Sequence, residues 1–194
     1  PEAYATSYLN LVYEGHLQKG QYVYIAAGAS GLASCAIPLA KALGAYVVTS
    51  VMNSEVEKKI AHLPVDYIIN QEKESIPEAF EKFEKAGHPI NLCMDCLSGN
   101  DLGKAMPFMA RGGYWVVIST LAGIETQVML RPLLTKGLHL VGSMLRNRTN
   151  DEKAIILSDL VRDIWSYFTK GTIKPSIYKV LNITEAEEAH QILL

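Results

Sequence analysis

The sequence predicts an α/β fold in which a doubly wound, parallel sheet of six strands carries helices on both faces. Three observations lead to this fold class. Short apolar runs alternate with helical stretches, the connections between them are short, and most of the runs are apolar on both faces. Such strands belong to parallel sheets that helices cover on both sides, and alternating strands and helices form right-handed crossovers.

The elements follow one another in a regular order. Gly44 is the type of residue that closes a helix, and Asn53 is a typical cap for the next helix. We expect six strands at 22–27, 45–50, 66–69, 90–95, 114–118 and 138–142, with helices at 31–43, 53–62, 77–85 and 99–109.

Segments at both ends extend this array. We expect a leading helix within residues 1–19 and a helical extension over 150–194. The extension comprises a long helix at 151–169, a short strand near 177–181 and a helix near 185–193. Apolar residues at helical spacing mark the face of the long helix that we expect in the core. They are Ile155, Ile156, Leu160, Ile164, Trp165 and Phe168.

Composition argues against several classes of function. The formal net charge is -2, and no apolar run approaches the roughly 18 residues of a membrane span, so we expect neither a nucleic-acid nor a membrane partner. Three cysteines and no recognisable signal peptide favour the reducing cytoplasm. Cys93 and Cys96 fall in an apolar strand, without a second Cys or His pair to complete a zinc site, so we expect no metal.

The most informative segment joins the first strand to the first helix. In the G-x-G-x-x-G/A fingerprint of Rossmann-type folds, Gly28 takes the first position, Ser30 replaces the second glycine and Ala33 takes the third. Backbone N–H groups and the positive helix end would hold a pyrophosphate there. Such a turn also occurs in α/β proteins without nucleotides, but its position here predicts that 1–194 is a dinucleotide-binding domain. The candidate binding residues are Gly28, Ser30, Gly31, Leu32 and Ala33.

The end of the second strand bears on which dinucleotide fits. NAD-binding folds place an acidic residue there to bind the ribose hydroxyls. This chain has no acid at the strand end, and its first one, Glu55, lies in the next helix. The missing acid removes a repulsion against a 2′-phosphate, and Lys58 is among the nearest cations, although a solvated helix charge is the commoner role of such a lysine. We expect Ser50, Asn53 and Lys58 near the adenosine ribose, with NADPH favoured and NADH as the alternative.

Motifs along the whole chain resemble one family. Pro1-Glu2-Ala3 with Thr6 precedes the first strand, and Gly142-Ser143-Met144-Leu145-Arg146-Asn147-Arg148 follows the sixth. Glu185-Ala186 with Ala189-His190 lies near the end of the sequence. In this order and spacing the chain resembles the zinc-free, zeta-crystallin-like NADPH:quinone oxidoreductases of the medium-chain dehydrogenase/reductase superfamily, and their p53-inducible subgroup in particular.

The resemblance implies an enzyme that moves hydride from NADPH to a quinone or another conjugated carbonyl. It implies a homodimer that pairs through an edge strand, and it implies that the family's substrate-roofing domain is absent from residues 1–194. Arg148 is implied to meet the pyrophosphate or the partner domain, with a surface ion pair as the alternative. The residues implied to line the cofactor cleft are Thr6, Ser30, Gly31, Asn70, Ser119, Leu121, Gly123, Leu145 and Arg146.

Three departures from the family pattern favour a second hypothesis. Met52 stands where the family has glycine, Val56 where it has lysine, and Gln71 where it has tyrosine. The family's lysine and tyrosine hold the 2′-phosphate. The alternative is therefore a non-catalytic relative that binds nucleotide weakly or serves as a protein-interaction domain. A methyltransferase-like domain ranks last, because it would need an acid after the second strand.

The sequence offers no residue that we can name as catalytic. A quinone that has received hydride can take its proton from water, so the proposed chemistry does not require a protein acid. The five histidines are scattered along the chain. Asp95, at the end of the fourth strand, is either a catalytic carboxylate or, more commonly for such a position, a cap for the following turn.

Overall fold

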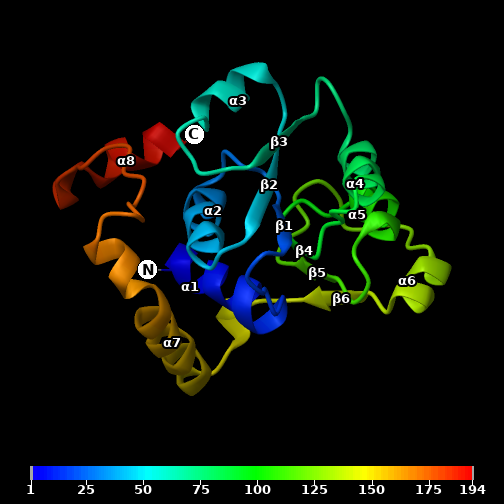
Figure 1. The fold of residues 1–194 in the computed structure, drawn as a ribbon. Helices are drawn as coiled ribbons and strands as arrows, with labels where there is room; N and C mark the ends of the chain where they lie inside the picture. Colours follow the sequence, from blue (N-terminus) through cyan, green and yellow to red (C-terminus); the bar gives the residue numbers. More distant parts are fainter. Residues whose placement is uncertain (1, 194) are drawn as a thin grey trace.

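A six-stranded parallel sheet forms the centre of the molecule (Figure 1). The computed structural model describes residues 2–193. The strand order is β3-β2-β1-β4-β5-β6, and all neighbouring strands run parallel. The expected fold class is confirmed, and each strand begins and ends within two residues of its predicted range. The strands are β1 (Tyr22–Ile25), β2 (Tyr46–Val51), β3 (Tyr67–Asn70), β4 (Leu92–Asp95), β5 (Tyr114–Val117) and β6 (His139–Gly142).

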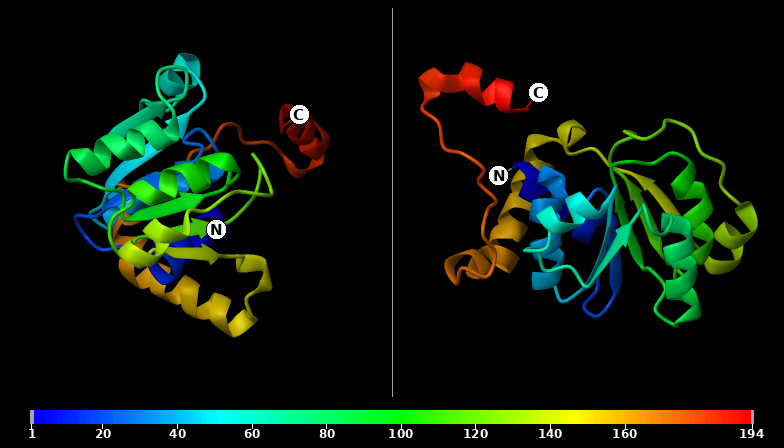
Figure 2. Two further views of the ribbon diagram at one scale, coloured as in Figure 1. Left: turned by 90° about the vertical axis from the view of Figure 1, so that its right-hand side faces the viewer. Right: turned by 90° about the horizontal axis from the view of Figure 1, so that it is seen from above.

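Helices cover both faces of this sheet, as the sequence predicts (Figure 2). One core contains Ile37 and Ile164 from helices on the first face, and a second core contains Phe80 and Leu102 from helices on the opposite face. All of β4 and all of β2 except its first residue, Tyr46, are buried, which explains their continuous apolar runs. The first face carries α1 (Glu2–Tyr8), α2 (Gly31–Ala42) and α7 (Asn150–Thr169), and the second carries α4 (Ile76–Lys85) and α5 (Asn100–Ala105).

The strand order indicates where on the sheet a ligand would bind. The chain winds outward in one direction from β1 to β3 and in the other from β4 to β6, so the order reverses between β1 and β4. In open α/β sheets, ligands bind at this switch point, outside the carboxyl ends of the strands. The turns that follow the strands therefore form the candidate site.

The leading helix is shorter and less regular than the predicted range of 1–19. The α-helical turns of α1 pass into a π-helical segment, η1 (Leu9–Glu14), which ends at Gly15. The end of α1 and the segment η1 are held against α7 by two phenol–carboxylate hydrogen bonds, from Tyr8 Oη to Asp163 Oδ2 at 2.5 Å and from Tyr13 Oη to Asp159. We call these two hydrogen bonds the clasp.

The strand predicted near 177–181 is absent from the described chain. These residues are extended but have no strand beside them, and Ile177 and Tyr178 are 68% and 88% exposed. A single extended segment leaves its backbone groups to water and gains no ladder hydrogen bonds, so apolar sequence alone does not make a strand. The segment leads away from the sheet to α8 (Ala186–Leu193), as Figures 1 and 2 show.

The apolar stripe predicted on α7 is only partly core. Ile156, Leu160 and Ile164 are buried, whereas Ile155 and Trp165 are 56% and 55% exposed. Helical spacing selects one face of a helix but not how much of that face a neighbour covers, so the residues at the margins of the stripe remain outside the core.

Three helical segments also differ from expectation. The helix predicted at 99–109 is divided into α5 and a 3₁₀ turn, Met106–Phe108, which contains Pro107. Proline lacks the N–H that would continue an α-helix. A helix without a prediction, α6 (Leu130–Lys136), precedes β6, and α3 (Ser54–Lys59) is shorter than its predicted range. None of the described helices combines the length and apolar character that a membrane span requires.

Candidate cofactor site

The turn after β1 is fixed by close packing against β2. Gly28 N–H donates to the Ser50 carbonyl at 2.8 Å. A Cβ atom on Gly28 would lie 2.6 Å from Thr49 Oγ1, so no side chain fits at this position. Glycine is therefore required for contact with β2, at the point where the fingerprint predicts a tight turn.

The start of α2 has the features expected of a phosphate-binding turn. Ser30 Oγ accepts a hydrogen bond from Ala33 N at 3.1 Å and caps the helix. Its hydroxyl proton remains available to a ligand. A Cβ atom on Gly31 would meet nothing within 4 Å, so the backbone here is open to an incoming group. The Ala33 N–H is taken up by this cap, and the backbone at Gly31 leaves the start of the 12-residue helix accessible to an anion.

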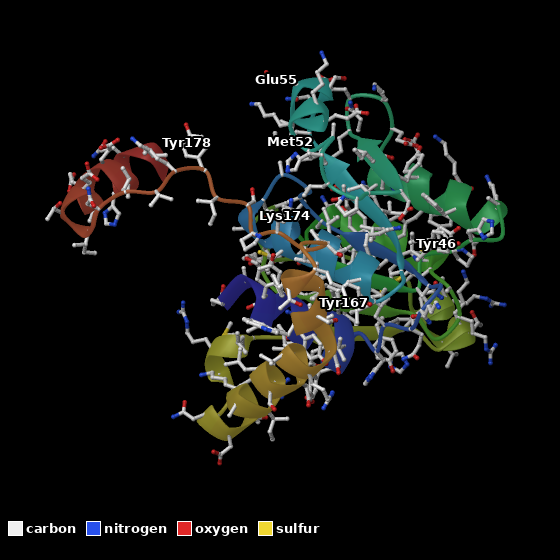
Figure 3. The ribbon with its side chains drawn as sticks, turned by 60° about the vertical axis from the view of Figure 1, so that its left-hand side comes forward. Tyr46, Met52, Glu55, Tyr167, Lys174 and Tyr178 are labelled. Atoms are coloured by element: carbon white, nitrogen blue, oxygen red, sulfur yellow. The ribbon has the colours of Figure 1, made fainter. Side chains whose placement is uncertain are left out.

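The predicted ribose-binding residues lie in different surroundings. Ser50 is buried and its Oγ lies 2.8 Å from Tyr24 Oη, so its side chain belongs to the core and only its backbone reaches the turn. Asn53 Oδ1 accepts from Val56 N at 2.9 Å and caps α3. Lys58 is exposed in the second half of the same helix. Figure 3 shows Met52 and Glu55 at the outer corner where β2 leads into α3.

Asn70, at the end of β3, is bound to neighbouring side chains. Its Nδ2 donates to Ser54 Oγ at 2.9 Å and to Glu57 Oε2 at 2.6 Å. Together with the Lys73 ammonium, the Asn70 amide holds the pKa of the Glu57 carboxyl below its usual range. The corner formed by the ends of β2 and β3 is therefore a connected polar network.

Of its two expected roles, Asp95 has the structural one, as a cap for the turn after β4. Its Oδ1 accepts from Leu97 N at 2.8 Å and from Ser98 N at 3.0 Å. Its Oδ2 accepts from Trp115 Nε1 at 2.8 Å, and the residue is 3% exposed. The carboxylate therefore caps the turn after β4 and ties it to β5, which leaves no oxygen directed at a substrate.

A cavity of about 330 Å³ lies at the other half of the carboxyl edge. It brings together three predicted site residues: Thr6 from α1, and Leu145 and Arg146 from the 3₁₀ turn after β6. A second cavity of about 460 Å³ shares Leu145 and Arg146 and extends along α7 to Lys153. Polar and apolar side chains line both cavities.

Other predicted residues of this half are more exposed or differently engaged. Ser119, Leu121 and Gly123 lie in the exposed loop after β5, and Leu121 is 77% exposed. Arg148 forms ion pairs with Glu14 and, at 3.2 Å, with Glu152, so it has the role given above as the alternative.

Two polar residues that the sequence analysis did not identify also line the smaller cavity. Asn10 Nδ2 donates to the Thr6 carbonyl at 2.7 Å, but Asn10 Oδ1 has no partner among the described residues. Ser143 Oγ is likewise buried and unpaired there. An asparagine inside the apolar run Leu9–Val12 was the available signal. The π-helical turn that carries it is a type often found at functional sites.

The cysteines do not fit a metal site. No group of three or more His, Cys, Asp or Glu side chains converges among residues 2–193. Burial raises the pKa of the Cys93 thiol and, together with the nearby Asp95, that of Cys96. Metal-binding thiols need to lose their protons, and this environment opposes that loss.

Two curated proteins are similar in sequence to most or nearly all of this chain. A quinone oxidoreductase-like protein 2 homolog of Nematostella vectensis is 26% identical over 198 residues, which cover 99% of this chain and 52% of that protein. A mitochondrial enoyl-[acyl-carrier-protein] reductase of Rattus norvegicus is 28% identical over 168 residues, which cover 81% of this chain and 45% of that protein. The chain thus spans about half the length of these curated relatives.

A solved structure and a family pattern complete the comparison. The quinone oxidoreductase of Thermus thermophilus, whose complex with NADPH is also known, matches 100% of this chain and 60% of its own with a TM-score of 0.79. At 20% identity this likeness shows the fold. The zinc-binding dehydrogenase family matches residues 31–161, from the start of α2 into α7. The chain therefore belongs to the zinc-binding dehydrogenase family, in the medium-chain dehydrogenase/reductase superfamily, and has the fold of its cofactor-binding domain.

Proposed function

We propose that this chain is the dinucleotide-binding part of an oxidoreductase that transfers hydride to a quinone or another conjugated carbonyl. The donor is a reduced nicotinamide dinucleotide, with NADPH favoured by the sequence analysis and NADH as the alternative. The observation that carries the proposal is the open, Ser30-capped start of α2 at the switch point of the sheet. The names of the relatives above support the choice of substrate class.

The two halves of the carboxyl edge suit the two halves of a dinucleotide. The pyrophosphate would lie over Gly31, where the helix N-terminus favours negative charge. The adenosine would lie toward the ends of β2 and β3, and the nicotinamide toward the cavity at Thr6 and Leu145.

In this arrangement the protein binds and orients, and the cofactor supplies the hydride. Holding the nicotinamide ring in the cavity after β6 would fix which of its faces meets an acceptor, which is the contribution of positioning to the rate. Since Asp95 is committed to the turn after β4, we assign no proton transfer to it. We derive no step through zinc, because the residues present do not fit it.

We propose that the acceptor is a small molecule and that two copies of the chain pair through β6. This edge strand exposes its backbone and most of its side chains, as its exposure pattern shows. An unpaired edge strand is a surface on which another strand can add. Residues outside this chain would roof the substrate.

The substitution Gly31→Ala tests the proposed pyrophosphate position. The added methyl group meets no protein atom, so we expect an unchanged or slightly higher free energy of unfolding. It would stand between the helix N-terminus and a pyrophosphate, so we expect the affinity for NADPH and NADH to fall by about tenfold or more, roughly 1.4 kcal/mol. Calorimetric titration and urea denaturation of the same sample measure both quantities.

Ser34→Ala, one turn further along α2, serves as the control, because its hydroxyl donates within the helix to the Gly31 carbonyl. Equal binding by Gly31→Ala and the unsubstituted chain would remove the pyrophosphate from this turn. If neither dinucleotide binds the unsubstituted chain at millimolar concentration, the proposal fails and the non-catalytic relative replaces it. The exposed, apolar Met52 at the end of β2 is the observation that favours this second candidate.

A further inference from the structure

We propose that the adenosine end of the site rejects a 2′-phosphate and selects NADH, and that Glu72 is the residue that makes this choice. The inference rests on the proposed function, because it concerns which dinucleotide occupies the same site. NADH thus replaces NADPH, the dinucleotide that the sequence alone favours. Three observations at the corner between β2, α3 and β3 support it.

The first observation is a carboxylate held at the start of α3. Glu72 Oε2 accepts from both Ser54 N and Ser54 Oγ, each at 3.0 Å. The Glu72 backbone N–H donates to Asn70 Oδ1 at 3.0 Å, which fixes the turn after β3. Three hydrogen bonds of Glu72 therefore fix this carboxylate between the start of α3 and the end of β3.

The Glu72 carboxylate lies in the part of the fold where the adenosine ribose would bind. Ser54 follows directly after the cap of α3, close to the carboxyl end of β2. In Rossmann-type folds the ribose hydroxyls of the adenosine lie beside that strand end and donate to a carboxylate there. The sequence has no acid directly after β2, and the carboxylate comes instead from the turn after β3.

The second observation is that two of the three nearby lysines are already neutralised. Lys59 Nζ lies 2.9 Å from Glu55 Oε1, and Lys73 Nζ lies 3.2 Å from Glu57 Oε2. Asp66 and Glu74 are paired as well, with Lys41 and Lys82. Glu72 is thus the carboxylate of this corner that has no ion-pair partner among residues 2–193. A doubly negative phosphate beside it would meet repulsion.

The third observation is the loss of the lysine and the tyrosine that the resemblance assigns to 2′-phosphate binding. Val56 is apolar, and Gln71 offers only a neutral amide. Met52, which follows β2, is apolar and 74% exposed. A 2′-hydroxyl can donate a hydrogen bond to Glu72, whereas a 2′-phosphate has only acceptor oxygens to offer a carboxylate. The same side chain thus attracts one dinucleotide and repels the other.

The test compares the dissociation constants of NADH and NADPH by calorimetry. We expect NADH to bind at least about tenfold more tightly at about 20 mM salt, and the ratio to shrink at about 500 mM salt as ions screen the repulsion. AMP and adenosine 2′,5′-bisphosphate, as probes of the adenosine end alone, should show the same order. This salt dependence is a property of the unsubstituted chain and does not depend on any variant folding.

The variant Glu72→Gln keeps the size and the hydrogen-bonding reach of the side chain but removes its charge. We expect it to strengthen NADPH binding by about tenfold and to change NADH binding by less than about threefold. Glu81→Gln on α4, which removes the same charge from an ion pair with Lys85, is the matched control and should move neither constant.

Two results would overturn the inference alone. The first is that the unsubstituted chain binds NADPH as tightly as NADH, or more tightly. The second is that Glu72→Gln keeps the melting temperature and leaves the ratio of the NADPH and NADH dissociation constants unchanged. Both leave the proposed function intact, because a dinucleotide still binds. Binding of neither dinucleotide would instead overturn the proposed function and this inference together.

Discussion

Single side chains in this site mostly hold the backbone and leave ligand contacts to main-chain groups. Ser30 caps α2, Asn53 caps α3, and Asp95 caps the turn after β4. The sequence could predict the two helix caps from residue type, since serine and asparagine are favoured there. It left Asp95 with two roles, because the choice depends on Trp115, which is brought beside Asp95 only when β4 pairs with β5.

The structural role of Asp95 makes a prediction about stability. In Asp95→Ala the Trp115 indole N–H and two turn N–H groups lose their acceptor inside the protein. We expect the free energy of unfolding to fall by about 2–4 kcal/mol, because buried donors without partners are costly. Urea denaturation followed by tryptophan fluorescence measures this change.

Asp151→Asn, an exposed acid in the first turn of α7, is the control and should change stability much less. The dinucleotide affinity of any folded Asp95→Asn protein should remain close to that of the unsubstituted chain. A stable Asp95→Ala protein with lost binding would instead restore a direct functional role for the carboxylate.

At the scale of elements, periodicity located the helices and strands but not the extent of their contacts. The long helix α7 shows this difference best. Its apolar stripe was correctly placed, yet the covered part is limited to the residues that face α1 and α2. The short α6 was missed because its apolar residues are few and Pro132 interrupts them.

Neighbouring residues of α7 should therefore respond very differently to truncation. Ile164 is fully buried and Trp165 is 55% exposed. We expect Ile164→Ala to lower the free energy of unfolding by about 2–4 kcal/mol through the cavity that it leaves. Trp165→Ala should lower it by less than about 1 kcal/mol, although the removed side chain is larger.

Chemical denaturation of both variants measures the contrast, and each serves as the other's control. Comparable losses would show that the exposed face of α7 is covered in solution, for instance by a second copy of the chain. Such a result would revise the assignment of Trp165 to the surface.

At the scale of the whole molecule, the sequence was sufficient to predict the sheet. It was insufficient to predict the contacts between residues that lie far apart in the chain. The alternating pattern places each strand, and the fingerprint at Gly28 selects the first of them. Nothing in the pattern connects Tyr8 to Asp163, or Asn10 to Ser143, because these pairs meet only when the whole sheet has formed. The same limit hid Glu72, whose partner Ser54 belongs to another element.

The clasp predicts a stability term that depends on pH. Arg162 and the Tyr8 hydroxyl hold the pKa of the Asp163 carboxyl below its usual range, and burial together with Asp163 raises the pKa of Tyr8. Tyr8→Phe removes the hydrogen bond and should lower the free energy of unfolding by about 1–2 kcal/mol near pH 7, allowing for the partial exposure of Asp163.

The sign follows from the lowered carboxyl pKa. The stabilisation is present above the unfolded-state pKa of about 3.9 and is lost as the pH falls through the lower folded-state value. The raised pKa of Tyr8 keeps the phenol protonated at neutral pH, so the term persists upward to about pH 9. Denaturation of both proteins between pH 3 and 9 measures it, and a difference that stays constant down to pH 3 would contradict the assignment.

The clasp also has a consequence for the order of events during synthesis. Tyr8 and Asp163 are 155 positions apart in the chain. At about 5–20 residues per second, the ribosome needs on the order of ten to thirty seconds to make the partner of the leading helix. During that interval α1 lacks its contacts with α7, and the side of α1 that faces α7 stays open to solvent and to chaperones. The first helix to be synthesised is thus among the last to form all of its tertiary contacts.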